Sequence, residues 1–341
     1  TIQKFEESTG LLSNRANIIC ISDEAHRSQA GLGQKTTITE KGVKHHYGFA
    51  KYLRDSLPNA TYVGFTGTPL DNTLDVFGPI VDRYTMTEAV ADEITRKIVY
   101  EGRAAKIMID SVKVKEIELF YDQCKQEGSS DYQIEESKKM MTRIDVILND
   151  PDLLAKIAQD IVEHYEKRIE EGSTVLGKAM IVCSSRSIAW NLYQAIIHLR
   201  PEWAEIKECI EGETLSEKER KEIKPMPRIA MVITRDKDND SDELYNLLGN
   251  DEYRKMLDKQ FKEEKSNFKI AIVVDMWITG FDVPSLDTMY CFKPLQMHTL
   301  IQTISRVNRV YPGKEKGLVV DYLGIKQQMN EALHQYGGNG D

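Results

Sequence analysis

Two neighbouring acids follow an apolar run near the start of the chain. Asp23 and Glu24 come directly after "IICIS" (Ile18–Ser22), and His26 completes the string "DEAH". In an open parallel sheet, ligands bind at the carboxyl ends of the strands. An acid there can hold Mg²⁺ on a nucleotide's phosphates through water, and the next acid can polarise the attacking water. The alternatives are a pair of solvated turn acids and a surface histidine.

A second polar cluster ends the next apolar run. The string "GFTGTP" (Gly64–Pro69) places Thr66 and Thr68 beside one flexible and one rigid backbone position. If the two runs are neighbouring strands, these hydroxyls share a sheet edge with Asp23, and His26 can sense their loop. We therefore favour a hydrogen-bond relay over an ordinary turn.

A predicted helix near the C-terminus carries two arginines. Its apolar stripe, at helical spacing, comprises Met297, Leu300, Ile301, Ile304 and Val307. At 100° per residue, Gln302, Arg306 and Arg309 cluster on the opposite face. A guanidinium can stabilise the charge that develops on a transferring phosphoryl group, so the pair suits two arginine fingers. The alternative is a solvated basic face.

Two further strand ends carry candidate ligand residues. In "DMWITGFDVPSLD", Gly280 permits close backbone approach, and Asp282 can accept from a ribose hydroxyl or orient an arginine. In "CSSRS", Ser184 and Arg186 can contact a nucleic-acid backbone. The alternatives are a turn at the first strand end and a helix N-cap at the second.

The elements that must position these residues alternate between strands and helices. Residues 17–22 and 61–67 are predicted strands on either side of a predicted helix at 48–57. A second set follows, with predicted strands at 178–184, 228–234, 269–276, 288–292 and 317–323. Continuous apolar strands with intervening helices are typical of parallel sheets. We predict an α/β chain with two parallel-sheet domains.

The two sets are separated by a charge-rich stretch. Residues 103–150 have a helical composition and few strand signals, which predicts a helical linker or insertion. A strong helix then begins at Pro151, with Asp150 as its cap, and ends at Gly172. We expect a first domain at 1–102, the linker at 103–150, a second domain at 151–330 and a flexible tail at 331–341.

Composition narrows the classes of protein. The 341 residues carry a net charge of -9, which argues against a non-specific nucleic-acid coat but permits a motor that grips a few phosphates. The five cysteines include no CxxC pair, and no apolar run is long enough to span a membrane. The chain also starts without a secretory signal. We expect a cytoplasmic protein of a bacterium or archaeon with no membrane partner.

The order of these motifs resembles that of superfamily 2 helicases and translocases, which have two RecA-like domains. Five short sequences resemble those of the R (motor and restriction) subunit of type I restriction–modification enzymes: "TIQKF", "SDEAHRSQ", "GFTGTPL", "ITGFDVPSLDTMY" and "LIQTISRVNR". The resemblance implies a motor that uses ATP to translocate double-stranded DNA and cleaves it far from the recognition site. It also implies modification and specificity subunits as partners.

The resemblance assigns a role to each candidate residue. Asp23 coordinates Mg²⁺ through water, and Glu24 activates the water that attacks ATP. The nucleotide-cleft residues are Gly280, Asp282 and Gln302, and the fingers are Arg306 and Arg309. The residues that couple hydrolysis to motion are His26, Thr66 and Thr68. The residues that contact DNA are Ser184 and Arg186.

One expected motif is absent from the sequence. The family pattern has G-x-x-x-x-G-K-[ST] before the acidic strand, and no such string occurs in the 341 residues. The nearest string, "GLGQKTT" (Gly31–Thr37), has Gln34 between Gly33 and Lys35 and follows the acidic strand. We interpret it as a flexible surface loop, with Lys35 near DNA. We expect the P-loop and the nuclease carboxylates to lie before Thr1, so that the first domain is incomplete and the chain alone is inactive.

Two other classes stay open. A superfamily 2 helicase of another kind, such as one in DNA repair, shares these motifs but separates strands. A non-catalytic DNA-binding or scaffold fragment is favoured by the missing P-loop and disfavoured by the intact acids and arginines.

Overall fold

The computed structural model describes residues 10–25, 35–39, 42–46, 49–67, 74, 76–103, 144–278, 280–295, 297–326 and 329–330. The chain divides into two compact units. Unit 1 comprises Thr1–Glu88 and Leu333–Asp341, and unit 2 comprises Ala89–Ala332. Both units contain parallel strands, which confirms the predicted α/β class.

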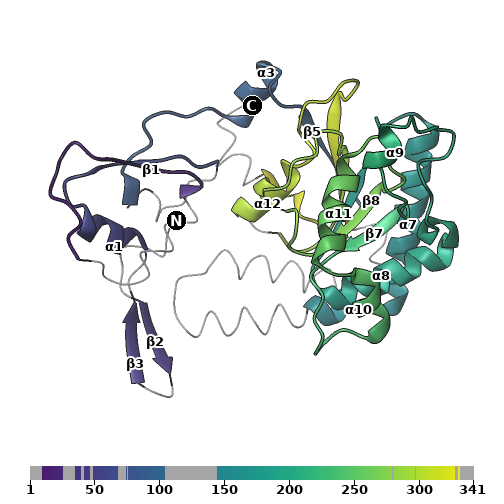
Figure 1. Cartoon of the computed structure of the whole chain (residues 1–341), viewed down its shortest axis with the longest axis horizontal. Helices are drawn as coiled ribbons and strands as arrows, with labels where there is room; N and C mark the ends of the chain where they lie inside the picture. Colours follow the sequence, from purple (N-terminus) through teal and green to yellow (C-terminus); the bar gives the residue numbers. More distant parts are fainter. Residues whose placement is uncertain are drawn as a thin grey trace. The chain divides into compact units, whose positions relative to one another are not determined.

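Unit 1 contains a two-stranded parallel sheet of β1 (Ile19–Ser22) and β4 (Thr61–Gly64), with α1 (Phe49–Ser56) between them in sequence (Figure 1). These three elements were predicted. The string "GLGQKTT" was predicted to be a loop, but Lys35–Thr39 form β2, which pairs antiparallel with β3 (Gly42–His46). Four threonine or isoleucine residues in "KTTIT" favour an extended backbone, and the sequence reasoning underweighted them.

Unit 2 is built on a six-stranded sheet in which every neighbouring pair is parallel. Its strands, in spatial order, are β5 (Lys97–Gly102), β10 (Lys316–Asp321), β9 (Thr288–Phe292), β6 (Ala179–Cys183), β8 (Ile270–Val273) and β7 (Ile229–Val232). The inner strands β6, β8 and β9 are buried throughout. Their continuous apolar sequences therefore mark strands covered on both faces.

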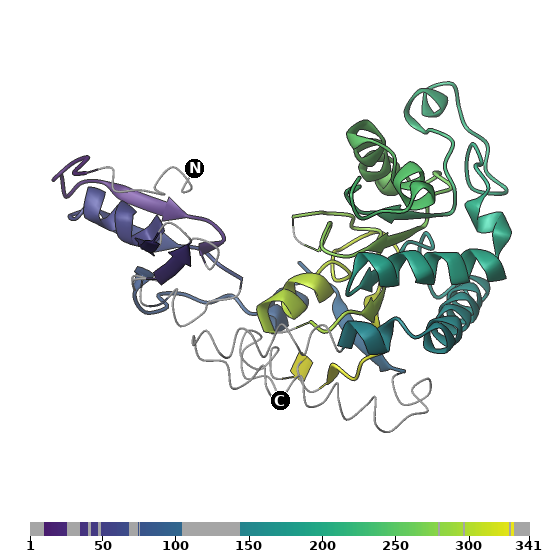
Figure 2. The same cartoon turned by 90° about the horizontal axis from the view of Figure 1, so that it is seen from below.

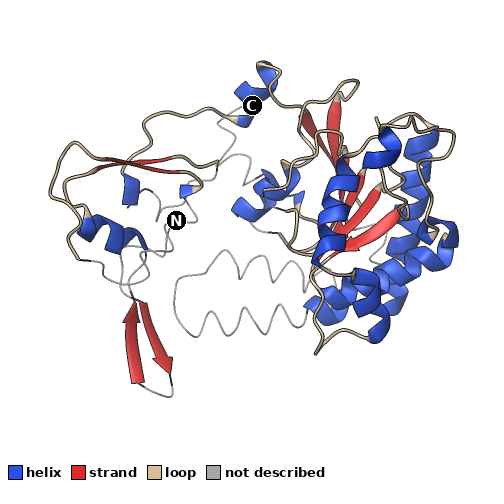
Figure 3. Cartoon of the chain, viewed as in Figure 1, coloured by secondary structure: helices blue, strands red, loops and turns tan. Residues whose placement is uncertain are grey.

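Helices cover both faces of this sheet (Figures 1, 2 and 3). The helices α7 (Pro151–Glu170) and α8 (Arg186–Leu199) pack against each other. Crossovers between parallel strands are right-handed as a rule, and by that rule the reversed strand order after β7 puts α11 (Asp251–Lys262) and α12 (Met297–Ile304) on the opposite face from α7 and α8. The shorter elements are α3 (Met86–Ala91), η3 (Pro201–Ala204), α9 (Glu219–Glu222) and α10 (Asp242–Leu248).

The predicted boundary at residue 102 differs from the observed one. Residues 97–102 form β5, which pairs with β10 in the sheet of unit 2. The hydroxyl of Tyr100 donates to Oδ2 of Asp321 at 2.5 Å and fastens this edge strand. Unit 2 accordingly begins at Ala89 rather than at residue 151. Residues 104–143 of the predicted linker, and the predicted tail at 331–341, lie outside the described residues.

The start of α7 follows the predicted capping pattern. Asp150 is the N-cap, its Oδ1 accepts from the amide of Leu153 at 3.0 Å, and Pro151 occupies the first helical turn. The cap satisfies one of the amides that a helix start leaves without a partner. This helix also carries buried polar residues, Asp160 and His164, which the apolar pattern did not indicate.

Candidate active site

In unit 1 the structure brings the predicted acids and one predicted threonine to the same sheet edge. Ser22 pairs with Gly64, so Asp23 and Glu24 leave β1 beside Phe65 and Thr66, which leave β4. Two backbone hydrogen bonds continue the pairing beyond the strands. The amide of Phe65 donates to the carbonyl of Ser22 at 2.8 Å, and the amide of Ala25 donates to the carbonyl of Phe65 at 2.9 Å. His26 and Thr68 lie outside the described residues.

The backbone at Glu24 turns sharply. Its φ of 47° lies in the left-handed region, which is uncommon for a residue with a side chain. Its amide donates to Oδ1 of Asp23 at 2.8 Å, and both acids are exposed. The next residue, Ala25, is fully buried. The turn therefore fixes the two carboxylates at the edge while the chain re-enters the core.

Gly64 permits this close packing. A Cβ atom on Gly64 would lie 2.9 Å from Cγ of Phe77 and 3.0 Å from Cβ of Ala25. Real Cβ atoms do not approach so closely, so a larger residue would push the two strand ends apart. Close packing at the end of β1, the strand that leads into Asp23 and Glu24, thus explains why Gly64, the first residue of "GFTGTP", is a glycine.

In unit 2 the two predicted arginines lie beyond the helix rather than on its face. The helix α12 ends at Ile304, and the chain turns through residues 305–310, which we call the finger loop. Leu300, Ile301, Ile304 and Val307 are buried as predicted. The backbone of Val307 lies against Gly317 of β10.

Side-chain bonds join the finger loop to the turn that contains Gly280 and Asp282. Nη1 of Arg306 donates to the carbonyl of Phe281 at 2.8 Å, and its Nε donates to the carbonyl of Gln302 at 3.1 Å. Nε of Arg309 lies 3.2 Å from Oδ1 of Asp282. Five predicted residues of unit 2 therefore share one site: Gly280, Asp282, Gln302, Arg306 and Arg309. Of the two alternatives for Asp282, this geometry fits the one in which it orients an arginine.

An aromatic cluster supports this turn, and sequence reasoning missed it. The rings of Trp277 and Phe281 stack at 3.9 Å with an interplanar angle of 8°, and Phe261 of α11 packs beside both. Trp277 has a φ of 66°, so its backbone is strained as well as buried. Gly280 has a φ of 74° and open space at its Cβ position. The turn is thus held by ring packing, while Gly280 supplies a conformation that other residues rarely adopt.

Ser184 and Arg186 lie at the carboxyl end of β6. Arg186 donates through Nη1 to the carbonyl of Thr234 and through Nη2 to both oxygens of Asp240, one of them at 2.6 Å. The side chain of Asp240 is only 2% exposed. The loop of residues 235–241 is therefore tied to Arg186 by an ion pair. The guanidinium of Arg186 is occupied within the protein, and its contact with DNA stays a prediction.

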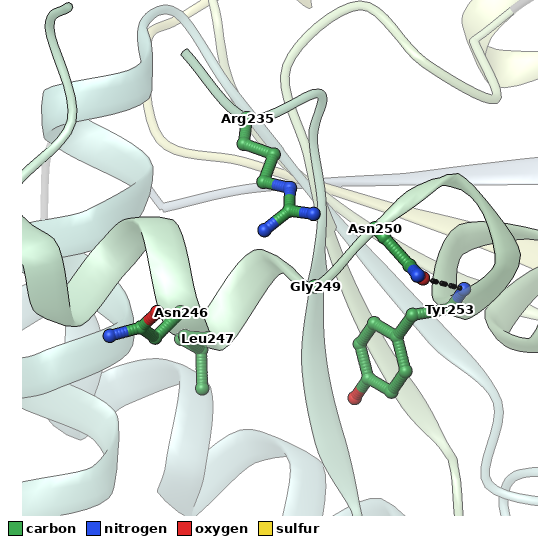
Figure 4. A pocket seen from close by; sticks show the side chains of 6 residues that line it. All are labelled: Arg235, Asn246, Leu247, Gly249, Asn250 and Tyr253. Atoms are coloured by element: carbon green, nitrogen blue, oxygen red, sulfur yellow. Dashed lines mark hydrogen bonds between the residues drawn. The ribbon is translucent and has the colours of Figure 1, made fainter. Parts of the chain in front are cut away.

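A pocket of about 520 Å³ lies next to this loop (Figure 4). Asn246 and Leu247 line it from the end of α10, and Asn250 and Tyr253 line it from the start of α11. The guanidinium of Arg235 extends toward Gly249 between them. Asn250 caps α11 through its bond to the amide of Tyr253 at 2.9 Å, so its side-chain oxygen is already engaged.

Comparison with known proteins identifies relatives of this chain. The family model for SWI2/SNF2 ATPases matches residues 1–134, and the model for domain 3 of the type I restriction enzyme subunit R matches residues 177–324. The chain is 38% identical to the HindI endonuclease subunit of a type I restriction enzyme from Haemophilus influenzae, over 98% of this chain and 30% of that protein. This chain is homologous to type I restriction enzyme R subunits.

A second R subunit homologue is 35% identical over 98% of this chain and 29% of its own length. It is described as the MjaIXP endonuclease subunit of Methanocaldococcus jannaschii. A solved fragment described as an HsdR subunit of a type I restriction enzyme from Vibrio vulnificus shares the fold. Its TM-score is 0.51 at 14% identity, over 85% of this chain and 44% of that one.

The chain spans about 30% of the length of the R subunit relatives that it matches. No helix among the described residues is long and apolar enough to cross a membrane.

Proposed function

We propose that this chain is part of the ATP-dependent motor of a cytoplasmic type I restriction enzyme R subunit. The motor couples ATP hydrolysis to translocation of double-stranded DNA, and cleavage follows at a distance. Modification and specificity subunits are the proposed partners. The observation that carries the proposal is the set of bonds joining Arg306 and Arg309 to the Gly280–Asp282 turn. Arginines fixed beside a glycine turn at a strand end suit recognition of a nucleotide's phosphates.

The acidic edge of unit 1 supplies the second part of the proposed chemistry. Glu24 is exposed at the strand end, where it can hold a water molecule for attack on the γ-phosphate. Thr66 lies at the same edge and would connect this event to movement of the chain, together with His26 and Thr68. Ser184 and Arg186 keep their proposed contact with the DNA backbone.

A magnesium ion fits Asp23. Mg²⁺ in such sites takes one or two carboxylates and completes its shell with water and phosphate oxygens. Asp23 offers one exposed carboxylate whose Oδ1 already accepts from the amide of Glu24, which fixes the side chain. When bound, Mg²⁺ neutralises charge on the phosphates. Because the 341 residues contain no G-x-x-x-x-G-K-[ST] string, we expect the chain alone to hydrolyse ATP only at the background rate.

The proposal is tested in a full-length R subunit that carries this sequence, assembled with its modification and specificity subunits. DNA-stimulated ATP hydrolysis and triplex displacement are measured for the wild type, Glu24→Gln and Glu170→Gln. We expect Glu24→Gln to lower both rates at least 100-fold with DNA binding retained. Glu170 is an exposed glutamate of α7, so Glu170→Gln should match the wild type. Wild-type turnover by Glu24→Gln would overturn the proposal, and separation of duplex strands would favour a helicase instead.

A further inference from the structure

The backbone of the finger loop is held by a segment far away in the sequence. Residues Ile94–Arg96, which we call the connecting segment, precede β5. Thr95 and Arg309 form an isolated antiparallel bridge, and the amide of Arg96 donates to the carbonyl of Asn308 at 2.6 Å. Asn308 is buried, so water does not readily replace this bond.

The connecting segment is tied in turn to α3. The carbonyl of Ala89 accepts from the amide of Ile94 at 2.9 Å and from the amide of Thr95 at 3.1 Å. Ala89 belongs to α3, and the chain passes from unit 1 into unit 2 between Glu88 and Ala89. A continuous series of backbone hydrogen bonds thus runs from the unit boundary to the finger loop.

The other side of the finger loop rests on β10. A Cβ atom on Gly317 would lie 2.2 Å from the carbonyl oxygen of Val307 and 2.7 Å from its carbonyl carbon. The strand therefore needs glycine here, because the backbone of Val307 occupies the place of a side chain. The stretch between Arg306 and Arg309 is confined on both sides by backbone atoms.

We propose that Thr95 and Arg96 are positioning residues for Arg309, and that their backbone pairing sets where its guanidinium lies. The inference rests on the proposed function of Arg309. Displacing a catalytic group by about 1 Å can cost about 10²-fold in rate, so the loss of this pairing should be measurable.

The test separates the backbone of Arg96 from its side chain. In the full-length assembled R subunit, Arg96→Pro removes the amide that donates to Asn308, whereas Arg96→Ala keeps it. We expect Arg96→Pro to lower kcat for DNA-stimulated ATP hydrolysis at least tenfold, with KM for ATP and DNA affinity within twofold of the wild type. Arg96→Ala should keep kcat within twofold. Equal rates for the two variants would overturn the proposal.

A second pair serves if Arg96→Pro does not fold. Thr95→Gly keeps every amide but loosens the bridge residue, and Thr95→Val keeps the branched side chain that favours an extended backbone. Within the part of the chain that the structure describes, Oγ1 of Thr95 is buried without a hydrogen-bond partner, so valine should be tolerated. The proposal requires a loss of kcat in Thr95→Gly that is absent in Thr95→Val. Equal behaviour of this pair would overturn it.

Failure of the inference and failure of the proposed function give different results. If the wild type shows no DNA-stimulated hydrolysis, the proposed function fails. Hydrogen exchange on the 341-residue chain then still decides the positioning role. Amides of residues 305–310 should exchange at least tenfold faster in Arg96→Pro than in Arg96→Ala. If the proline variant does not fold, the same difference is expected between Thr95→Gly and Thr95→Val. Equal exchange within the pair would overturn the proposal.

Discussion

Nε of Arg309 lies 3.2 Å from Oδ1 of Asp282, and both side chains are well exposed, at 45% and 62%. An exposed pair of this kind contributes about 0–1 kcal/mol. The carboxylate can therefore orient the guanidinium without trapping it. Arg306, by contrast, donates to two backbone carbonyls and is fixed to the turn. The two arginines are thus held differently: Arg306 is anchored to backbone carbonyls, and our proposal is that Arg309 leaves Asp282 for a phosphate.

Replacing Arg309 should remove most ATP hydrolysis. We expect Arg309→Ala in the full-length protein to lower DNA-stimulated turnover by about 10³-fold, the lower end of the range for arginine fingers, while DNA binding is spared. Asp282→Asn should lower it less than tenfold, because it removes only a weak orienting contact. Steady-state ATPase assays at saturating DNA measure both. A mutant Arg309→Ala with wild-type turnover would exclude the finger role.

Gly317 should tolerate no side chain. The Cβ of Gly317→Ala would meet the Val307 carbonyl at 2.2 Å, so either β10 or the finger loop must shift. Overpacking of this kind costs about 1–3 kcal/mol of unfolding free energy. All three tryptophans, at positions 190, 203 and 277, lie in unit 2, so their fluorescence reports its urea unfolding.

The control for Gly317→Ala is Val319→Ala, which creates a cavity in the same strand away from the finger loop. Val319 is fully buried, and its truncation should cost a comparable free energy of unfolding. In the full-length protein, at a temperature where both variants are folded, only Gly317→Ala should lose ATP turnover. If ATP turnover instead falls in both variants, in line with their lower free energies of unfolding, then Gly317 has no special role at the finger loop.

Sequence patterns predicted the elements better than their ends. The five strands expected in the second half all form, as does the capped helix α7, because apolar period and capping residues are local signals. The edge strand β5 was missed because "KIVYEG" mixes polar and apolar residues and is only half-buried. The other edge strand, β7, is buried throughout, and its apolar sequence was predicted as a strand.

The site was predicted as a set of residues but not as a set of contacts. Gly280, Asp282, Arg306 and Arg309 were singled out from residue chemistry, and they converge in unit 2. The packing of Phe261 on Trp277 and Phe281, and the pairing of Arg309 with Thr95, depend on segments distant in sequence. No local pattern encodes such tertiary pairing. The left-handed turn at Glu24 is likewise set by the buried residue that follows it.

Acidification should destabilise unit 2 through His164. This residue is 8% exposed, its Nδ1 lies 2.9 Å from the hydroxyl of Tyr290, and its Nε2 lies 3.4 Å from Glu101. Burial, helped by the nearby charges of Arg103 and Arg168, lowers the pKa of His164 to about 4, against the opposing effect of Glu101 and Asp160. The neutral ring is thus favoured in the fold. The contribution of His164 to the free energy of unfolding is therefore fully present above about pH 6.5, the pKa of histidine in the unfolded chain. It is lost as the pH falls toward 4.

The size of this effect should be on the order of 1–3 kcal/mol between pH 6.5 and pH 4. Urea unfolding of the 341-residue chain, followed by tryptophan fluorescence, measures it across that range. His164→Gln cannot titrate and should flatten the pH dependence relative to the wild type. His198→Gln, on the exposed face of α8, should leave it unchanged. The same slope in all three proteins would show that His164 does not carry it.

Breaking the pair of Arg186 and Asp240 should affect folding before it affects DNA binding. The guanidinium bonds both carboxylate oxygens of a side chain that is 2% exposed, and it also bonds the carbonyl of Thr234. Removing one partner of a buried pair costs about 3–5 kcal/mol, because the other charge stays buried. Arg186 is itself 30% exposed, so we expect a smaller cost of about 2–4 kcal/mol for Arg186→Ala.

A double-mutant cycle with Asp240→Asn identifies the source of that cost. If the pair acts as a unit, the double variant should be less destabilised than the sum of the single variants, by at least ~1 kcal/mol. DNA affinity of the folded full-length protein distinguishes the other role. Loss of a phosphate contact would reduce, by about one, the magnitude of the slope of log K for DNA binding against the logarithm of the salt concentration. The proposed DNA contact predicts this reduced slope in Arg186→Ala. An unchanged slope together with lower stability would show that Arg186 serves only to bond Asp240 and Thr234.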